Sequence, residues 1–142
     1  MIMEIYIKGK YENGIGSAAY VVVESGKEVA QGAKRLGAEF TLCGQTFPCD
    51  AFSTEVLAAI CGMARIGEER LVNVYSNNKS VIAWLHRGGE PEGRKPLLDI
   101  WRRYAEGKDV LVDWIPFFER DPSGNEWNRL CCTLASDALA DR

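Results

Sequence analysis

The sequence lacks the long apolar run of a membrane-spanning protein. A transmembrane helix needs about 20 consecutive apolar residues, and no stretch of this 142-residue chain approaches that length. The start of the chain, residues 1–4 (MIME), also lacks the basic residues and the apolar centre of a signal peptide. We therefore expect a cytoplasmic protein that has no membrane partner.

The sequence also lacks the Cys and His pattern of a zinc site. The chain has a single histidine, His86, and its cysteines include no CxxC pair, which is the usual beginning of a zinc site. There are five cysteines: Cys43, Cys49, Cys61, Cys131 and Cys132. With an odd number of cysteines and no export signal, we expect reduced, structural thiols rather than a disulfide framework or a metal cluster.

The sequence also lacks an excess of positive charge. The 17 Lys and Arg residues are outnumbered by 20 Asp and Glu, which gives a net charge of −3 and a pI near 5.3. A protein that grips nucleic acid over a whole face is usually basic, so only a local basic patch is compatible with this composition. The length and the hydrophobic content of 46% indicate one globular domain, residues 1–142, with its own core.

The first quarter of the chain has the pattern of an antiparallel meander. Residues 3–9, 17–24 and 28–36 are expected to be strands, the second of them rich in β-branched residues. Short turns that contain Asn13-Gly14 and Gly26 separate them, because glycine supplies the positive φ that such turns need. Residues 37–48 show no sustained period and are expected to be a loop with at most a short extended piece.

The rest of the chain alternates between helices and strands. We expect helices at 52–66, 79–86, 97–105 and 126–140, and strands at 71–76 and 109–115. Asp50 and Ser53 are plausible caps of the first helix, and Pro96 suits the start of the third. A meander followed by β-α-β units predicts an α/β fold: a five-stranded mixed sheet, antiparallel in its first three strands and parallel in the last two, with helices on both faces.

Four local motifs in register resemble type 1 ribonuclease H over nearly the whole chain. They are residues 5–10 (IYIKGK), 54–60 (TEVLAAI), 74–82 (VYSNNKSVI) and 128–135 (NRLCCTLA). The resemblance implies a ribonuclease H-like fold. It also implies a site where four acids from two strands and two helices hold paired magnesium ions that drive phosphodiester hydrolysis in an RNA/DNA hybrid.

Most of those acids are replaced here. The positions that match them are occupied by Lys8, Glu55, Asn77 and Cys132, so only Glu55 is retained, and the formal charge of the set moves from about −4 to about zero. Magnesium needs oxygen ligands, usually carboxylates. We expect no metal or cofactor, with Mg²⁺ or Mn²⁺ only if residual nuclease activity exists, and a Lys8–Glu55 ion pair with Asn77 hydrogen-bonded beside it.

Each of these residues also has a purely structural interpretation. Glu55 suits the first turn of a helix, where an acid favours the dipole. Lys8 suits a solvated strand end, Asn77 suits a helix cap, and Cys132 suits a small core position.

Substrate contacts implied by the resemblance are missing too. Asparagines often precede the acid of the first helix in the family, whereas Ala51 and Phe52 stand here. The histidine of the family's catalytic loop has no counterpart within residues 116–127.

Basic residues are concentrated between residues 87 and 108. The candidates for phosphate contact are Arg87, Arg94, Lys95, Arg102 and Arg103. Together with Lys108 these are six basic residues, and four acids are interleaved with them in the sequence. The segment therefore carries a net charge of only about +2. It is either a solvated helix face with salt bridges or a phosphate-binding patch near the basic helical protrusion of some family members.

Three functions remain open. The first is a catalytically inactive ribonuclease H-like protein that binds RNA/DNA hybrid or other nucleic acid. The second is a protein-interaction or scaffold module on the same fold, with Phe117 and Phe118 after Pro116 available to a partner. The third is an active metal-dependent nuclease whose acids have been relocated to Asp113, Glu119, Asp121 or Asp137.

Overall fold

A five-stranded mixed sheet forms the centre of the computed structural model, which describes residues 2–87, 93–115 and 125–140. Its strands are β1 (Ile2–Glu12), β2 (Ile15–Glu24), β3 (Lys27–Leu36), β6 (Leu71–Ser76) and β7 (Asp109–Trp114). The order across the sheet is β3-β2-β1-β6-β7, in which β1 to β3 are antiparallel and β6 and β7 run parallel to β1. The predicted mixed sheet is confirmed, and its strand order places β1 at the centre, between β2 and β6.

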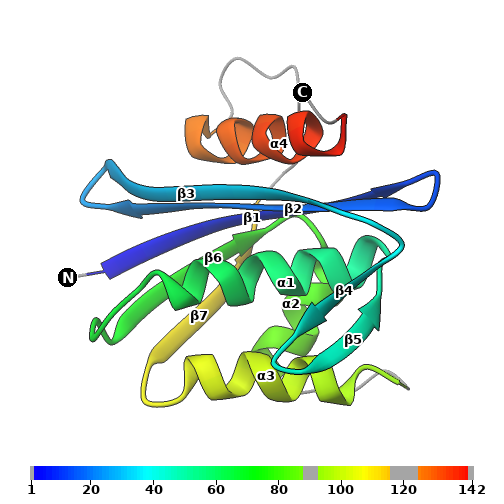
Figure 1. Cartoon of the computed structure of the whole chain (residues 1–142). Coiled ribbons are helices and arrows are strands. Elements are labelled where there is room, and N and C mark those ends of the chain that lie inside the picture. The colour runs from blue at the N-terminus through cyan, green and yellow to red at the C-terminus, as the bar shows by residue number, and fades with distance from the viewer. Residues whose placement is uncertain (1, 88–92, 116–124, 141–142) are drawn as a thin grey trace.

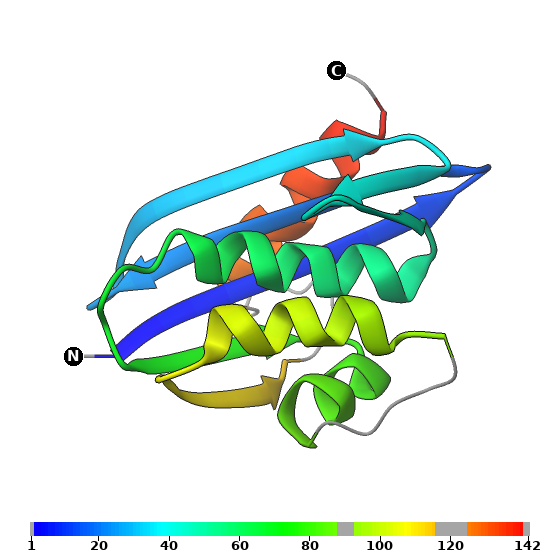
Figure 2. The same ribbon diagram turned by 60° about the horizontal axis from the view of Figure 1, so that its bottom comes forward.

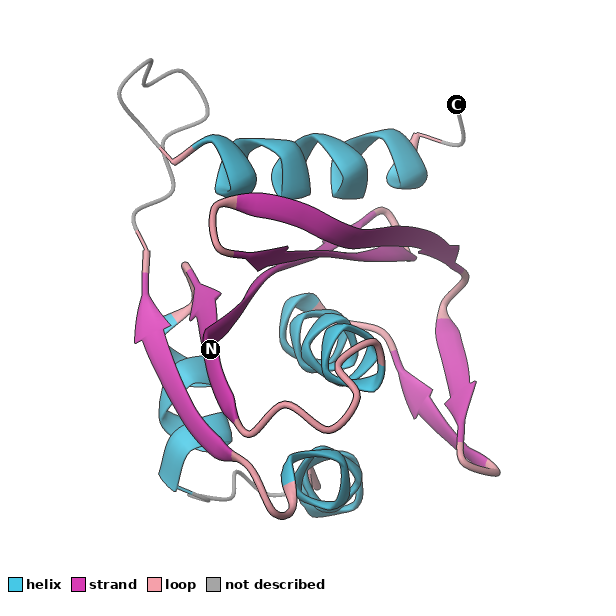
Figure 3. Ribbon diagram, turned by 90° about the vertical axis from the view of Figure 1, so that its left-hand side faces the viewer, coloured by secondary structure: helices cyan, strands magenta, loops and turns pink. Residues whose placement is uncertain are grey.

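Helices cover both faces of the sheet (Figure 1). They are α1 (Ala51–Ala64), α2 (Lys79–Arg87), α3 (Lys95–Ala105) and α4 (Glu126–Leu139). Figure 3 shows α4 on one face and α1 end-on beneath the other, with α3 beyond it. The α/β architecture with helices on both faces is therefore as predicted, and no described helix is of the length and apolar character needed to cross a bilayer.

Alternation along β1 builds two cores. Ile5 and Ile7 point toward α1 and are fully buried, whereas Tyr6 points toward α4 and packs with Cys131 and Ala135. Because successive side chains of a strand face opposite sides of a sheet, β1 serves both layers. The strand is therefore buried on both faces and contacts β2, β6, α1 and α4.

The turns follow the glycine signals of the sequence. Asn13 and Gly14 have φ of 53° and 76°, and Ser25 and Gly26 have φ of 52° and 76°. Positive φ at both central residues is the geometry of the tight turn that matches the twist of a hairpin.

Residues 37–48 correct one prediction, because they are not mainly a loop. They contain a hairpin of β4 (Glu39–Leu42) and β5 (Gln45–Pro48), which forms a separate two-stranded sheet. Cys43 and Gly44, both at positive φ, make its turn. The rings of Phe40 and Phe47 lie 5.6 Å apart across the hairpin. Strands of four residues are too short for a periodic signal, and this tertiary contact is invisible in sequence.

Candidate functional site

The first turn of α1 packs directly on β1 at Gly9. A Cβ atom at Gly9 would lie 2.3 Å from the backbone nitrogen of Glu55 and 2.4 Å from Oγ1 of Thr54, so no other residue fits there. The close approach lets the backbone N–H of Gly9 donate a hydrogen bond to Oε1 of Glu55 at 2.5 Å. The glycine after Lys8 thus brings the carboxylate of Glu55 against the strand.

The second oxygen of Glu55 is also occupied. Oγ of Ser76, the last residue of β6, donates to Oε2 of Glu55 at 2.6 Å and itself accepts from the N–H of Asn78 at 3.0 Å. The Glu55 side chain is only 1% exposed. Burial raises the pKa of Glu55 above its ordinary value, while the hydrogen bonds from Ser76 and Gly9 and the charge of Lys8 oppose that rise.

Lys8 meets Asn77 rather than the carboxylate. Its Nζ donates to Oδ1 of Asn77 at 3.2 Å, which places Asn77 beside Lys8 as expected. The ion pairs of the described residues do not include Lys8 with Glu55. The side chain of Lys8 alternates with Gly9 and therefore leaves β1 on the face opposite α1. The expected direct pair is thus corrected: Glu55 is held by neutral donors, and Lys8 acts on it from longer range.

Asn77, which the sequence suggested as a helix cap, does not cap α2. Its Nδ2 is buried and has no hydrogen-bond partner in the part of the chain that is described. The cap of α2 is instead Asn78, whose Oδ1 accepts from the N–H groups of Ser80 and Val81 at 3.1 and 3.2 Å. Asn77 is thereby directed toward Lys8 rather than used at the helix end.

Cys132 lies buried on α4, on the other face of the sheet. Its neighbour Cys131 contacts the backbone oxygens of Tyr6 and Ala19, each at 3.3 Å from Sγ. Burial raises the pKa of Cys131 well above its ordinary value; Cys132 and Glu55 add to the rise and Lys8 opposes it. Cys131 therefore lies within electrostatic range of Glu55 and Lys8. The five cysteines of the chain form no disulfides with one another.

Three solved structures that share this arrangement of elements are ribonucleases H. RNase H1 of the halophilic archaeon Halobacterium salinarum NRC-1 superposes with a TM-score of 0.76 at 17% identity and covers 100% of both chains. The N-terminal RNase H domain of rv2228c from Mycobacterium tuberculosis gives 0.76 at 15% identity, over 99% of this chain and 94% of that one. The chain has a type 1 ribonuclease H-like fold.

A third ribonuclease H structure was solved with nucleic acid. LC11-RNase H1 in complex with an RNA/DNA hybrid matches with a TM-score of 0.73 and 14% identity, over 98% of this chain and 97% of that one. No protein-family model and no curated protein matches the sequence. At these identities the likeness establishes the ribonuclease H-like fold alone.

The magnesium pair that a ribonuclease H-like fold implies does not fit these residues. Magnesium needs accessible oxygen ligands, but both oxygens of Glu55 and the amide oxygen of Asn77 already accept hydrogen bonds. The other groups here are an ammonium and an amide nitrogen, which cannot bind a cation. Within residues 2–87, 93–115 and 125–140, no three His, Cys, Asp or Glu side chains gather as a metal-ligand set.

The relocated acids do not join the cluster where they are described. Asp113 is exposed on β7 and accepts from the N–H of Trp114, and Asp137 is exposed on α4. Glu119 and Asp121 lie outside the described residues, as do Phe117 and Phe118.

The basic candidates divide between the two ends of α3. Arg94 pairs with Asp50, the N-cap of α1, and its guanidinium lies 4.9 Å from the centre of the Phe52 ring. This contact holds the starts of α1 and α3 together, and Figure 2 shows the two helices side by side. Asp99 receives both Lys95, at 2.7 Å, and Arg102, at 3.1 Å.

Two of the five basic candidates remain outside these contacts. Arg103 is exposed near the end of α3, and the side chain of Arg87 lies outside the described part. Arg94, Lys95 and Arg102 form ion pairs with Asp50 and Asp99. Most of the basic candidates therefore fit the first alternative, a helix face with salt bridges, better than a phosphate-binding patch.

Sequence reasoning missed Gly9 and Ser76, which hold Glu55 in place. Both were inside the quoted motifs, Gly9 directly after Lys8 and Ser76 directly before Asn77. Ser76 offered one signal, because it continues the alternation of the buried Val72 and Val74 and so had to face the core. A buried serine needs a hydrogen-bond partner, and Glu55 is that partner.

Proposed function

We propose that this chain is a ribonuclease H-like protein that binds RNA/DNA hybrid without hydrolysing it. The observation that carries the proposal is the state of Glu55, the retained acid, whose two oxygens accept hydrogen bonds from Gly9 and Ser76. The side chain is also only 1% exposed, so this carboxylate is held inside the protein and is not presented to a metal ion from solvent. One buried carboxylate beside an ammonium is a poor ligand set for two magnesium ions, which argues against the two-metal route to phosphodiester hydrolysis.

The replacements favour an anion over a cation. Lys8 brings a positive charge to the edge of the cluster and is partly exposed. An ammonium attracts a backbone phosphate, and phosphate contacts supply most of the affinity in nucleic-acid binding without requiring any chemistry. The choice of hybrid as the partner rests on the fold, since LC11-RNase H1 was solved with RNA/DNA hybrid bound.

One titration tests both halves of the proposal. A fluorescently labelled RNA/DNA hybrid is titrated with protein at several salt concentrations, and the same samples with Mg²⁺ or Mn²⁺ are run on a denaturing gel. We expect salt-sensitive binding and an intact RNA strand. Lys8→Gln should weaken binding, whereas Lys27→Gln, at the far end of the sheet, is the matched control and should not.

Two results would contradict the proposal. Absence of salt-sensitive binding removes the nucleic-acid role. Cleavage of the hybrid at an enzymatic rate, lost on Glu55→Gln, removes the claim of inactivity.

A further inference from the structure

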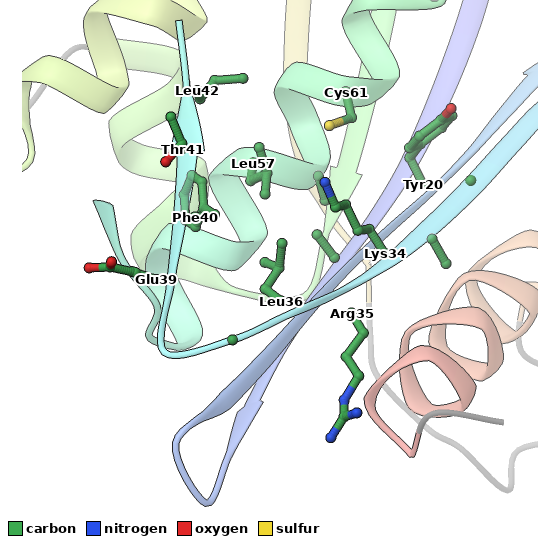
Figure 4. Close-up of a pocket in the computed structure, with 15 residues that line it drawn as sticks. Tyr20, Lys34, Arg35, Leu36, Glu39, Phe40, Thr41, Leu42, Leu57 and Cys61 are labelled. Atoms are coloured by element: carbon green, nitrogen blue, oxygen red, sulfur yellow. The ribbon is translucent and has the colours of Figure 1, made fainter. Parts of the chain in front are cut away.

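A pocket lies between β3, β4 and α1, beneath the β4–β5 hairpin. Its volume is about 580 Å³, within the range of about 300–1,000 Å³ that is typical of small-molecule sites. We call it the hairpin pocket. The large apolar side chains that line it are Leu36, Phe40, Leu42 and Leu57. Figure 4 shows these side chains converging from β3, β4 and α1.

One end of the hairpin pocket is positively charged. Lys34 extends from β3 over Leu57 toward Cys61, whereas Arg35, the next residue, points to the opposite side of the strand (Figure 4). Within the described residues Lys34 forms no ion pair. Nearby, Arg65 donates to the hydroxyl of Tyr20, another lining residue, at 2.9 Å. This end therefore holds cations with no acid bound to them in the described contacts.

The other ionisable groups of the pocket do not cancel that charge. Burial raises the pKa of Cys61, and the opposing effect of Lys34 is smaller, so the thiol stays neutral at neutral pH. Glu39, on β4, points away from Leu57 and Lys34 (Figure 4). The hairpin pocket is thus an open pocket with a mainly apolar lining and a positive rim on one side.

We propose that the hairpin pocket binds a small amphipathic carboxylate of the medium-chain aliphatic type. The apolar chain would lie against Leu36, Phe40 and Leu57, where its burial supplies most of the affinity. The carboxylate would pair with the ammonium of Lys34 at the rim. A cation is disfavoured by Lys34 and Arg65, and a neutral apolar molecule gains nothing from them.

Calorimetric titration with octanoate and octylamine tests the charge requirement, because the two probes share an apolar chain. We expect octanoate to bind and octylamine not to. Lys34→Met keeps the apolar stem and removes the charge, so it should weaken octanoate binding about fivefold, the value of a partly exposed ion pair. Lys27→Met, on the same strand but outside the pocket, is the control and should leave the affinity unchanged.

Thiol labelling locates the bound ligand. In a Cys43→Ser background the exposed thiol is gone, and Cys61 is more accessible than the three buried cysteines. Saturating octanoate should slow the modification of Cys61 several-fold, with circular dichroism confirming that each variant is folded. The proposal is overturned if millimolar octanoate does not bind, if octylamine binds as tightly, if Lys34→Met has no effect, or if Cys61 stays unprotected.

Discussion

Glu55 is the residue on which the proposed function depends most. In a metal-dependent nuclease its oxygens would face cations, but here they accept hydrogen bonds from Gly9 and Ser76 and are shielded from water. Two buried donors depend on this one side chain. The loss of Glu55 should therefore reduce the stability of the fold.

Glu55→Ala should cost about 2–4 kcal/mol of unfolding free energy, because it leaves the Gly9 N–H and the Ser76 hydroxyl unsatisfied and opens a cavity. Glu55→Gln keeps the shape and one acceptor, so its cost should stay within about 1 kcal/mol. Urea denaturation of both variants measures the difference. Equal stability of wild type and Glu55→Ala would show that the two hydrogen bonds do not matter.

Residue identity alone could locate this cluster only in part. The motifs of the sequence put Lys8, Glu55 and Asn77 in one neighbourhood, and the structure brings Lys8 and Asn77 into contact. The partners of Glu55 were missed, because a direct ion pair with Lys8 looks favourable until strand alternation is taken into account. The direction of the Lys8 side chain decides the outcome.

At the level of elements, the packing of α1 on β1 depends on a missing side chain. Gly9→Ala would place a methyl group against backbone atoms of Thr54 and Glu55, which cannot move away independently. We expect a loss of about 1–3 kcal/mol, the usual cost of overpacking a core.

Gly67→Ala is the matched control for that substitution, because its Cβ would meet no atom within 4 Å. Its effect should stay within about 0.5 kcal/mol. If thermal unfolding shifted equally for both variants, the helix would not be seated on Gly9 as described.

The start of α1 is fixed by Asp50. Its carboxylate accepts from the N–H groups of Phe52 and Ser53 at 2.9 and 2.7 Å, and it also pairs with Arg94. Asp50→Ala should cost about 1–2 kcal/mol, the value of a good N-cap.

Asp99→Ala tests whether that loss belongs to the cap or to ion pairs in general. Asp99 binds Lys95 and Arg102 on the exposed face of α3, where solvent screens the interaction, so its removal should change stability little. Chemical denaturation compares the two variants. Similar losses of unfolding free energy would contradict the assignment of the Asp50 effect to the N-cap of α1.

Long elements were the predictable part of the fold. The β-branched run in β2, the cap at Asp50 and the Asn13-Gly14 turn each carry a local signal that the structure bears out. The β4–β5 hairpin was not predictable, because its strands are short, most of its residues are exposed, and it is held by the Phe40–Phe47 contact. Its consequence, the hairpin pocket, was equally hidden.

For the whole molecule, two buried or half-buried acids should shape the pH dependence of stability in opposite directions. The pKa of Glu55 is raised in the folded state from an ordinary value of 4.5, mainly by burial. Its contribution to stability is therefore fully present below pH 4.5 and is lost as the pH rises through the folded pKa. The pKa of Asp50 is lowered from 3.8, because the hydrogen bonds and charge of Arg94 and the helix N–H groups outweigh desolvation. Its contribution is present above 3.8 and is lost below.

Unfolding measured across this pH range in wild type and Glu55→Gln separates the two effects. The stability of wild type relative to Glu55→Gln should be greatest near pH 4 and should decline as the pH rises above 4.5. The acid-side loss due to Asp50 should be the same in both proteins. A difference between them that does not vary with pH would contradict a raised pKa for Glu55.

The fold of the whole molecule was predictable from four weak motifs in register, whereas the chemistry was not. A ribonuclease H-like fold fixes where β1, α1 and β6 meet, and the side chains at that meeting point decide what it does. Here those side chains are the ammonium of Lys8 and the hydrogen-bonded oxygens of Glu55 and Asn77.

Metal binding at Glu55 is the most direct test of this account. Mn²⁺ is titrated into nitrogen-15-labelled protein, and the broadening of backbone amide signals is followed by two-dimensional NMR. The account predicts that the signals of Gly9, Ser76 and Asn78 broaden no more than that of Gly67, which is remote from the cluster. Saturable broadening confined to Gly9, Ser76 and Asn78, and abolished by Glu55→Gln, would contradict it.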